Sequence, residues 1–238
     1  TLGVSHTMEH FSAERCLELI PEVFSYLDEP IADASILPTY LLAAFTRKYV
    51  TVALAGDGSD ELFAGYPTFK AEALIDTYKT IPSFLRQKLI EPTIHALPVR
   101  HNYFSLDFKL KRFLEGAEED RRHRHQRWLG AFTDTEITEL LVDTPALLPG
   151  YDSSFGLLDK YFRSGPTSAE FHNDLLWSYA RTYLMDEVLV KVDRASMARG
   201  LEVRAPFLDY ELVEFVQKLP YHYKFSRGTG KYILKRLM

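Results

Sequence analysis

One uninterrupted apolar segment that stops at a small acidic turn constrains the fold more than any other part of the chain. Residues 50–55 read Val-Thr-Val-Ala-Leu-Ala, a run rich in β-branched residues without the alternation of a half-exposed strand. Such a run predicts a strand buried on both faces, as in a parallel sheet covered by helices. Ligands of these sheets bind beyond the carboxyl ends of the strands, so we expect a binding site directly after residue 55.

The turn that follows is built from small residues and reads Gly-Asp-Gly-Ser over residues 56–59. Gly56 and Gly58 lack side chains and would let backbone amides approach a ligand. Ser59 is expected to cap a short helix that begins at Asp60.

Three carboxylates, those of Asp57, Asp60 and Glu61, crowd this turn. They have a structural interpretation, because an acidic side chain at the amino end of a helix contributes roughly 0.3 to 1 kcal/mol. They also have a functional one, because mutually repelling carboxylates are gathered to bind a pair of cations or a nucleotide-bound Mg²⁺. The residues alone leave both interpretations open.

Length and composition exclude several classes of protein. A chain of 238 residues with 46% hydrophobic content can bury the core of one large domain or two small ones. The longest apolar runs, residues 41–44 and 50–55, are too short to span a bilayer, and no charged and apolar leader opens the chain. We therefore expect a cytoplasmic protein without a membrane partner. The formal net charge of −5 argues against a nucleic-acid partner.

The single cysteine, Cys16, excludes an intramolecular disulfide. Its apolar neighbours at helical spacing are Leu17, Ile20 and Phe24. This pattern predicts a core cysteine rather than a nucleophile.

The order of the predicted elements suggests an α/β crossover that leads into the apolar strand. Residues 1–8 are expected to begin in the middle of a domain. Ser12 should cap a helix that runs to Ile20, and Pro21 suits the first turn of another. A further helix is expected over residues 38–49.

Beyond residue 66 the pattern predicts helix after helix, and no further strand. Two amphipathic faces are expected to pack, Leu85, Leu89 and Ile90 on one and Phe108, Phe113 and Leu114 on the other. A longer helix over about residues 169–190 should be central to the second half of the chain.

Two polar segments invite functional interpretations that we reject. Residues 118–127 contain four arginines and two histidines, but His123 and His125 would face apart on a helix, so a solvated helix face is expected. Residues 164–168 resemble part of a phosphate loop, but Pro166 removes an amide and no strand precedes it. A turn and a helix cap are expected there.

Charged residues interrupt an otherwise apolar segment over residues 185–209. Four of them are expected to form structural ion pairs that fix two helices: Asp193, Arg194, Glu202 and Arg204. Near the end of the chain, Lys231 begins an amphipathic helix, where the helix dipole disfavours a cation. Its ammonium is therefore expected to serve an anionic partner.

Four segments carry a combined signature: AGDGSDELFAGY at residues 55–66, VDRASMA at 192–198, LEVRAPFLD at 201–209 and KYILK at 231–235. Together, and in this order, they resemble the synthetase domain of glutamine-dependent asparagine synthetases. The resemblance implies a helix-rich α/β fold of the adenine nucleotide alpha-hydrolase type, a PP-loop ATP pyrophosphatase with an incomplete parallel sheet and a large helical part.

The same resemblance implies that residues 1–238 form one synthetase domain cut from a longer protein. The Ser-Gly-Gly-x-Asp-Ser pyrophosphate loop, the amino-terminal glutaminase domain and the carboxyl-terminal tail of the family are not found in the sequence. The missing loop would supply the amides that hold pyrophosphate, so this piece alone is expected not to turn over. A homodimer is one expected form of the parent protein.

The implied reaction uses ATP and Mg²⁺. ATP adenylates a substrate carboxylate, pyrophosphate leaves, and ammonia derived from glutamine attacks to form an amide. By position, ATP would contact Ala55 and Gly56 together with Gly58 and Ser59.

Catalytic and metal roles are carried over in the same way. Asp60, with Glu61, would hold Mg²⁺. Asp57 would be the general base, where the best-known members have glutamate. Lys231 would balance charge on the α-phosphate as pyrophosphate departs.

The acceptor is expected to be aspartate, with asparagine as the product. However, Ile31 and Ala34 stand where asparagine-forming enzymes carry a threonine and an arginine. One alternative keeps the adenylation with another acceptor, as in β-lactam synthetases or enzymes that amidate a sugar acid. Another alternative, from a different class, is a non-catalytic helical interaction domain whose acidic turn is only a cap.

Overall fold

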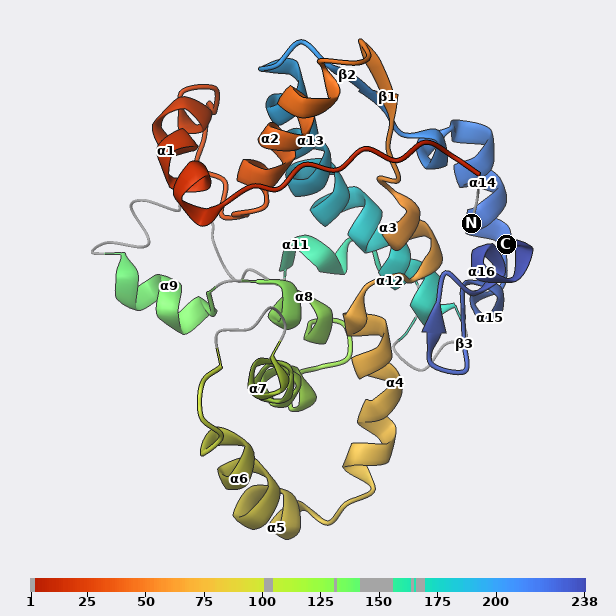
Figure 1. The fold of residues 1–238 in the computed structure, drawn as a ribbon. Helices are drawn as coiled ribbons and strands as arrows, with labels where there is room; N and C mark the ends of the chain where they lie inside the picture. The colour runs from red at the N-terminus through yellow and green to blue at the C-terminus, as the bar shows by residue number, and fades with distance from the viewer. Residues whose placement is uncertain (1–2, 101–104, 131, 142–155, 164, 166–169) are drawn as a thin grey trace. The chain divides into compact units, whose positions relative to one another are not determined.

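The computed structural model describes residues 3–100, 105–130, 132–141, 156–163, 165 and 170–238 (Figure 1). Most of the predicted turn and cap at residues 164–168 lies outside these ranges. The chain divides into two compact units. The first unit comprises residues 1–59 and 179–216, and the second comprises residues 60–178 and 217–238.

The first unit contains helices and a short parallel sheet (Figure 1). Its elements are α1 (Ala13–Phe24), α2 (Ile36–Thr46), β1 (Val52–Leu54), the π-helical segment η2 (Ala180–Val188), α13 (Leu189–Met197), β2 (Glu202–Arg204) and the 3₁₀ turn η3 (Pro206–Leu208). Two helices, α12 (Phe171–Tyr179) and α14 (Tyr210–Lys218), cross the boundary between the units.

The helical stretch from α12 through η2 to α13 matches the long helix predicted over residues 169–190, but it continues to Met197. Residue 169 itself lies outside the described part.

The first helix begins where the sequence predicts and ends later than predicted. The side chain of Ser12 accepts a hydrogen bond from Arg15 N at 3.2 Å, which confirms the cap. The helix then passes through Pro21 instead of restarting there. Leu19 and Val23, one turn apart on either side of the proline, are both buried, and this packing outweighs the loss of one backbone donor.

The core of the first unit joins α1, α2 and α13. Its buried members are Leu19, Val23, Ile36, Tyr40, Leu41 and Ala195, and Cys16 packs against them as predicted. The expected neighbours of the cysteine are wrong in part, because Leu17 and Phe24 are exposed. The buried face of α1 is thus rotated from the face that the sequence suggested.

The predicted helix over residues 38–49 is found as α2, which starts at Ile36 and ends at Thr46. Three turn residues separate it from the segment before β1. No strand occurs over residues 3–12.

The apolar segment at residues 50–55 forms a parallel strand, as predicted. β1 pairs with β2 in the register Val52↔Glu202, Ala53↔Val203 and Leu54↔Arg204. The predicted burial on both faces is wrong: Val52 is 41% exposed and Leu54 is 74% exposed. Within the described residues no helix packs closely against β1, which leaves these two side chains exposed.

The strand β2 contradicts the prediction that no strand follows residue 66. Its only sequence signal is a short alternation, in which apolar Leu201 and Val203 flank charged Glu202. Three residues of alternation are too few to distinguish a strand from a loop.

The second unit is mainly helical (Figure 1). Its elements are α3 (Ser59–Phe63), which begins at the boundary, α4 (Pro67–Lys79), α5 (Ser83–Leu85), the π-helical segment η1 (Arg86–Ile90), α6 (Glu91–His95), α7 (Leu106–Ala117), α8 (Arg124–Leu129), α9 (Asp134–Leu140), α11 (Gly156–Asp159), α15 (Tyr221–Lys224), β3 (Phe225–Ser226), β4 (Thr229–Gly230) and α16 (Tyr232–Leu237). Ile75, Ala117 and Trp128 form a core cluster between α4, α7 and α8.

The hairpin β3–β4 directly precedes α16. Its strands are antiparallel, with Phe225 opposite Gly230. Arg227 and Gly228 both have positive φ, 51° and 70°, as a type I′ hairpin turn requires. The residue that follows the hairpin is Lys231.

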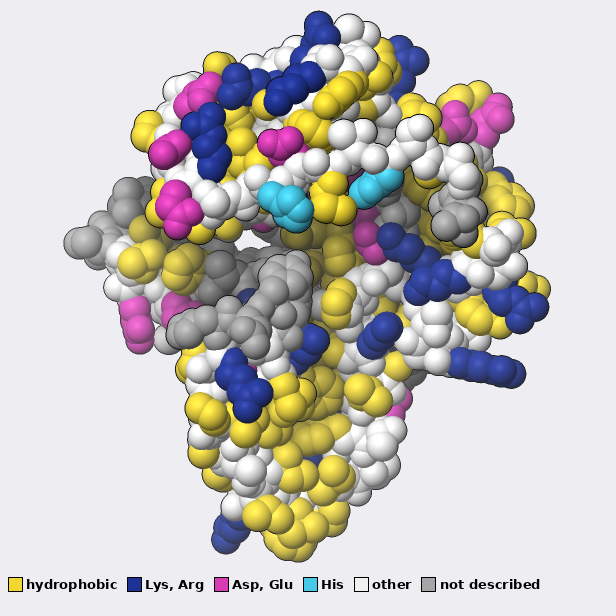
Figure 2. Space-filling view, viewed as in Figure 1, with side chains coloured by type: hydrophobic (Ala, Val, Ile, Leu, Met, Phe, Trp, Pro, Cys, Tyr) yellow, Lys and Arg dark blue, Asp and Glu magenta, His cyan; other side chains and the backbone are white. Residues whose placement is uncertain are grey.

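One predicted amphipathic face is not buried. Leu85 and Leu89 are 38% and 62% exposed, and Figure 2 shows hydrophobic side chains gathered over the region of α5 and α6. The π-helical winding of η1 changes the spacing on which that prediction depended. In the other predicted face Leu114 is buried, but Phe108 is 50% exposed.

The arginine-rich segment at residues 118–127 is not a solvated helix face. Arg124 is 4% exposed and His125 is 1% exposed. The carboxylate of Glu72, on α4, accepts from Arg124 at 2.6 Å and from Arg121 at 2.9 Å. This cluster, here called the Glu72 network, joins α4 to α8 and to the turn before it. The prediction failed because the partner carboxylate is distant in sequence.

Three of the four residues predicted to form structural ion pairs at residues 185–209 do form ion pairs, but neither pair joins two helices. Arg194 pairs with Asp28, and Arg204 pairs with Glu202 at 2.7 Å. No helix within the described residues is long and apolar enough to cross a bilayer.

Candidate functional site

The turn that follows β1 has an open backbone. Ala55 N donates to Arg204 O at 2.8 Å and thereby continues the ladder between β1 and β2. Gly56 is exposed, and a Cβ placed on it would meet no atom within 4 Å. The backbone at Gly56 is therefore accessible to a ligand, as the nucleotide prediction requires.

Gly58 is a glycine for two structural reasons. Its φ is 85°, and a Cβ would lie 2.2 Å from Leu208 Cδ2. Ser59, which is buried, is already the first residue of α3, so the helix begins one residue earlier than predicted.

Asp57 presents a half-buried carboxylate at this turn. Burial raises its pKa, while the Lys191 ammonium and its own backbone amide oppose the rise. In the described part of the chain, no other side chain hydrogen bonds to this carboxylate. A carboxylate with a raised pKa and an open oxygen has the chemistry of a general base.

Asp60 and Lys231, two predicted site residues that are far apart in the sequence, are in contact in the second unit. Lys231 Nζ lies 3.0 Å from Asp60 Oδ1, and the two side chains are 29% and 37% exposed. Lys231 N also donates to Phe63 O at 2.7 Å. The anionic partner expected for Lys231 is thus present in the protein as the carboxylate of Asp60.

Close backbone packing produces this contact. A Cβ on Gly65 would lie 1.8 Å from Asp60 Oδ1 and 2.5 Å from Lys231 Cε. A Cβ on Gly230 would lie 2.0 Å from Ala64 O. The two glycines therefore let the end of α3 and the start of α16 approach one another.

Lys231 has an unusual backbone conformation for a lysine. Its φ is 53°, in the left-handed region, and it stands at the N-cap position of α16. Ala64, on the facing segment, is fully buried and also has a φ of 53°. Non-glycine residues with such φ values are strained by roughly 1 to 2 kcal/mol each.

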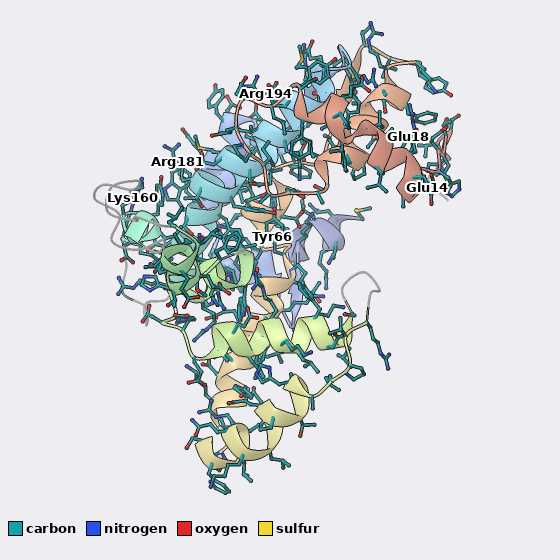
Figure 3. The ribbon with its side chains drawn as sticks, turned by 90° about the vertical axis from the view of Figure 1, so that its left-hand side faces the viewer. Glu14, Glu18, Tyr66, Lys160, Arg181 and Arg194 are labelled. Carbon is teal, nitrogen blue, oxygen red and sulfur yellow. The ribbon has the colours of Figure 1, made fainter. Side chains whose placement is uncertain are left out.

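Glu61 differs from Asp60 in its surroundings. Its side chain is buried, and Oε1 accepts a hydrogen bond from the Tyr66 hydroxyl at 2.5 Å. Figure 3 labels Tyr66 in the segment that leads into α4. Asp60 is thus the more accessible of the two predicted metal ligands.

The residues fit a magnesium ion that arrives with a nucleotide. No group of three or more His, Cys, Asp or Glu side chains in the described residues could hold a metal by itself. Mg²⁺ commonly takes one or two protein carboxylates, with phosphates and waters as its other ligands. Asp60, which directly follows the accessible turn in the sequence, would supply one such carboxylate.

Sequence reasoning missed Lys191 and the loop that it contacts. Lys191 Nζ lies 2.6 Å from Asp33 Oδ2 and 2.9 Å from Ser35 Oγ. Asp33 has a lowered pKa: burial would raise it, but hydrogen bonds from Lys191 and Ser35 outweigh burial. The available signals were a lysine inside an apolar helix and the polar loop at residues 28–35.

Comparisons with known proteins agree in one family. The asparagine synthase family model matches residues 1–238. A putative asparagine synthetase [glutamine-hydrolyzing] from Mycobacterium tuberculosis is 31% identical over 240 residues, which cover 100% of this chain and 34% of that protein. Asparagine synthetase [glutamine-hydrolyzing] 1 from Bacillus subtilis is 29% identical over 238 residues, which cover 99% of this chain and 35% of that protein.

The chain spans about a third of the length of these curated relatives. No solved structure matches it. The match to the family model over all 238 residues nevertheless identifies the chain as a member of the asparagine synthase family.

Proposed function

We propose that this chain is the ATP-dependent amide-forming part of a longer glutamine-dependent protein, with the fold of a PP-loop ATP pyrophosphatase. The observation that carries the proposal is the Asp60–Lys231 contact at 3.0 Å. A carboxylate suited to nucleotide-bound Mg²⁺ and a cation suited to phosphate charge lie side by side in the second unit, and in the sequence Asp60 directly follows the glycine turn with accessible backbone.

In this proposal the reaction has two steps. An oxygen of the acceptor carboxylate attacks the α-phosphorus of ATP, and the bond to pyrophosphate breaks with its electron pair on the leaving group. The nitrogen of ammonia then attacks the activated carbonyl carbon, and AMP leaves with the electron pair of its bond to that carbon.

The chain's own residues would serve these steps as follows. Backbone groups from Ala55 to Ser59 border the nucleotide. The Lys231 ammonium faces the negative charge that grows as pyrophosphate departs. Asp57 accepts a proton from the attacking nitrogen, for which its raised pKa suits it. Mg²⁺, when bound through Asp60, would neutralise phosphate charge.

The acceptor that we propose is aspartate, because the relatives are named asparagine synthetases. Ammonia would come from a glutaminase domain elsewhere in the longer protein, since those relatives are named glutamine-hydrolyzing and are about three times as long as this chain. Product analysis with aspartate, β-amino acids and sugar acids would distinguish this acceptor from the other carboxylates.

The central experiment measures acceptor-dependent pyrophosphate release by the intact protein. Lys231→Ala should lower kcat by at least about a hundredfold while ATP binding is retained, because the lysine acts on charge that develops in the transition state. Lys231→Arg should not restore the rate, because a planar guanidinium does not replace a compact ammonium.

Lys235→Ala is the matched control. Lys235 is an exposed lysine on the same short helix and should be dispensable. Melting temperatures of the variants report on folding. A near-normal kcat for Lys231→Ala, or a loss explained entirely by lower stability, would show that Lys231 does not act in the reaction.

A parallel experiment addresses the metal. Asp60→Asn should weaken the dependence on Mg-ATP far more than it lowers the melting temperature, because an amide is a poor substitute for a hard anionic ligand. Calorimetry with Mg-ATP separates this proposal from a non-catalytic interaction domain, which would bind no nucleotide.

A further inference from the structure

Lys191 lies in a charged cluster of the first unit that the roles proposed above do not use. Its side chain is only 12% exposed. Its ammonium donates to Asp33 Oδ2 and Ser35 Oγ, and Asp33 Oδ1 accepts from Ser35 N at 2.8 Å. Moving the ammonium would break hydrogen bonds that are largely shielded from water, so these contacts fix its position.

The topology of the first unit brings Asp57 toward this ammonium. α13, which carries Lys191, packs against β2, and β2 is the parallel partner of β1. The chain reaches Asp57 at the carboxyl end of β1. The positive charge of Lys191 acts on Asp57 against the burial that raises its pKa.

The hydrogen-bonding capacity of the two groups is complementary. An ammonium has three N–H donors, and Asp33 and Ser35 use two of them. Among the residues that the structure describes, Lys191 has no third acceptor and Asp57 has no side-chain donor. One N–H donor of Lys191 and the carboxylate of Asp57 therefore remain without these partners. Both groups are in the first unit, and the charge of Lys191 acts on Asp57.

We propose that Lys191 is a positioning residue for Asp57: tethered by Asp33 and Ser35, its ammonium directs its remaining N–H donor toward the Asp57 carboxylate at the end of β1. Burial, and the charge of Asp33, raise the pKa of Glu187, and the charge of Lys191 opposes that rise. Three carboxylates therefore share one cation. Without it, Asp57 would take up a proton more readily.

This inference rests on the proposed function in one respect only, the role of the ionised Asp57 carboxylate as general base. A base that accepts a proton from the attacking nitrogen must be ionised beforehand. Lys191 would therefore set the acid limb of the pH–rate profile without contacting the substrate.

The experiment is a carboxyl NMR titration of the intact protein labelled at aspartate, in which the Asp57 signal is assigned by its loss in Asp57→Asn. Lys191→Met should raise the apparent pKa of Asp57 by about one pH unit, a roughly tenfold increase in proton affinity. Lys191→Arg keeps the cation and should leave the titration near its wild-type position.

Arg194→Met is the matched control. Arg194 lies one turn further along α13 and pairs with Asp28 at the other end of the same loop. Figure 3 shows it on the part of α13 that lies next to α1. Removing this ion pair loosens the loop but leaves the Lys191 ammonium in place, so the titration of Asp57 should not move.

The outcomes separate this inference from the proposed function. An unmoved Asp57 titration in Lys191→Met, or equal shifts in Lys191→Met and Arg194→Met, would overturn the role of Lys191 whatever the activity. If the protein forms no amide, the proposed function fails, and the titration still decides whether Lys191 controls Asp57. When activity is present, the acid limb of kcat/KM should move to higher pH with Lys191→Met.

Discussion

Gly65→Ala is expected to damage the reaction much more than the fold. The new Cβ would lie 1.8 Å from Asp60 Oδ1 and 2.5 Å from Lys231 Cε, whereas ordinary contacts begin at 3.4 Å. Relief of both contacts requires displacements of about 1.6 Å and 0.9 Å, the differences between those distances. Both atoms lie toward the ends of flexible side chains, so they can move without disturbing the backbone.

The expected loss of stability is small. The Asp60–Lys231 pair is about one-third exposed, and ion pairs of this kind contribute about 0 to 1 kcal/mol. Gly65 does not have a positive φ, so alanine brings no backbone strain. Displacement of catalytic groups by about 1 Å can nevertheless cost a hundredfold in rate, or about 2.7 kcal/mol of activation free energy.

The assay is acceptor-dependent pyrophosphate release by the intact protein, with melting temperature measured on the same samples. Gly156→Ala is the control, because a Cβ at Gly156 meets nothing within 4 Å. If Gly65→Ala retains kcat within about threefold of wild type at an unchanged melting temperature, the reasoning that Asp60 and Lys231 must be held together for the reaction is refuted.

The remaining predictions concern the second unit. Glu72→Gln should lower the free energy of unfolding by about 3 kcal/mol, because it leaves the arginines of the Glu72 network without their carboxylate. Urea unfolding measures this loss. Glu118→Gln is the control and should have little effect, because Glu118 is exposed. Burial lowers the pKa of Lys224 from 10.5 to about 8, so the unfolded chain holds this proton more tightly than the folded chain. As the pH rises from about 8 to about 10.5, the free energy of unfolding of the wild type should therefore increase relative to that of Lys224→Met. The increase is at most about 1.4 kcal/mol per pH unit. An equal difference between the two proteins at both ends of that range would contradict this expectation.

The sequence predicts local features of the first unit well, because their causes are local. The side chain of Ser12 caps the helix that it precedes, and the apolar run before Gly56 forms a parallel strand. Burial could not be predicted in the same way, since Val52 is exposed because no helix in the described residues packs closely on β1, not because of its own character.

Long-range pairing escaped prediction for a related reason. Arg124 and Glu72 are 52 positions apart, and no local sequence pattern indicates that the carboxylate on α4 pairs with that arginine. Lys191 and Asp33 are 158 positions apart. The motifs identified Asp60 and Lys231 as functional candidates, but only the structure shows that they touch.

The left-handed backbone of Lys231 has a consequence for engineering. Glycine adopts this φ without strain, so a protein selected only for thermal stability would gain by replacing the lysine. Lysine is therefore less favourable than glycine for this backbone conformation. Under the function proposed above, a stabilising redesign that introduces glycine at position 231 would lower activity while it raises the melting temperature, so this position should be held fixed in any such effort.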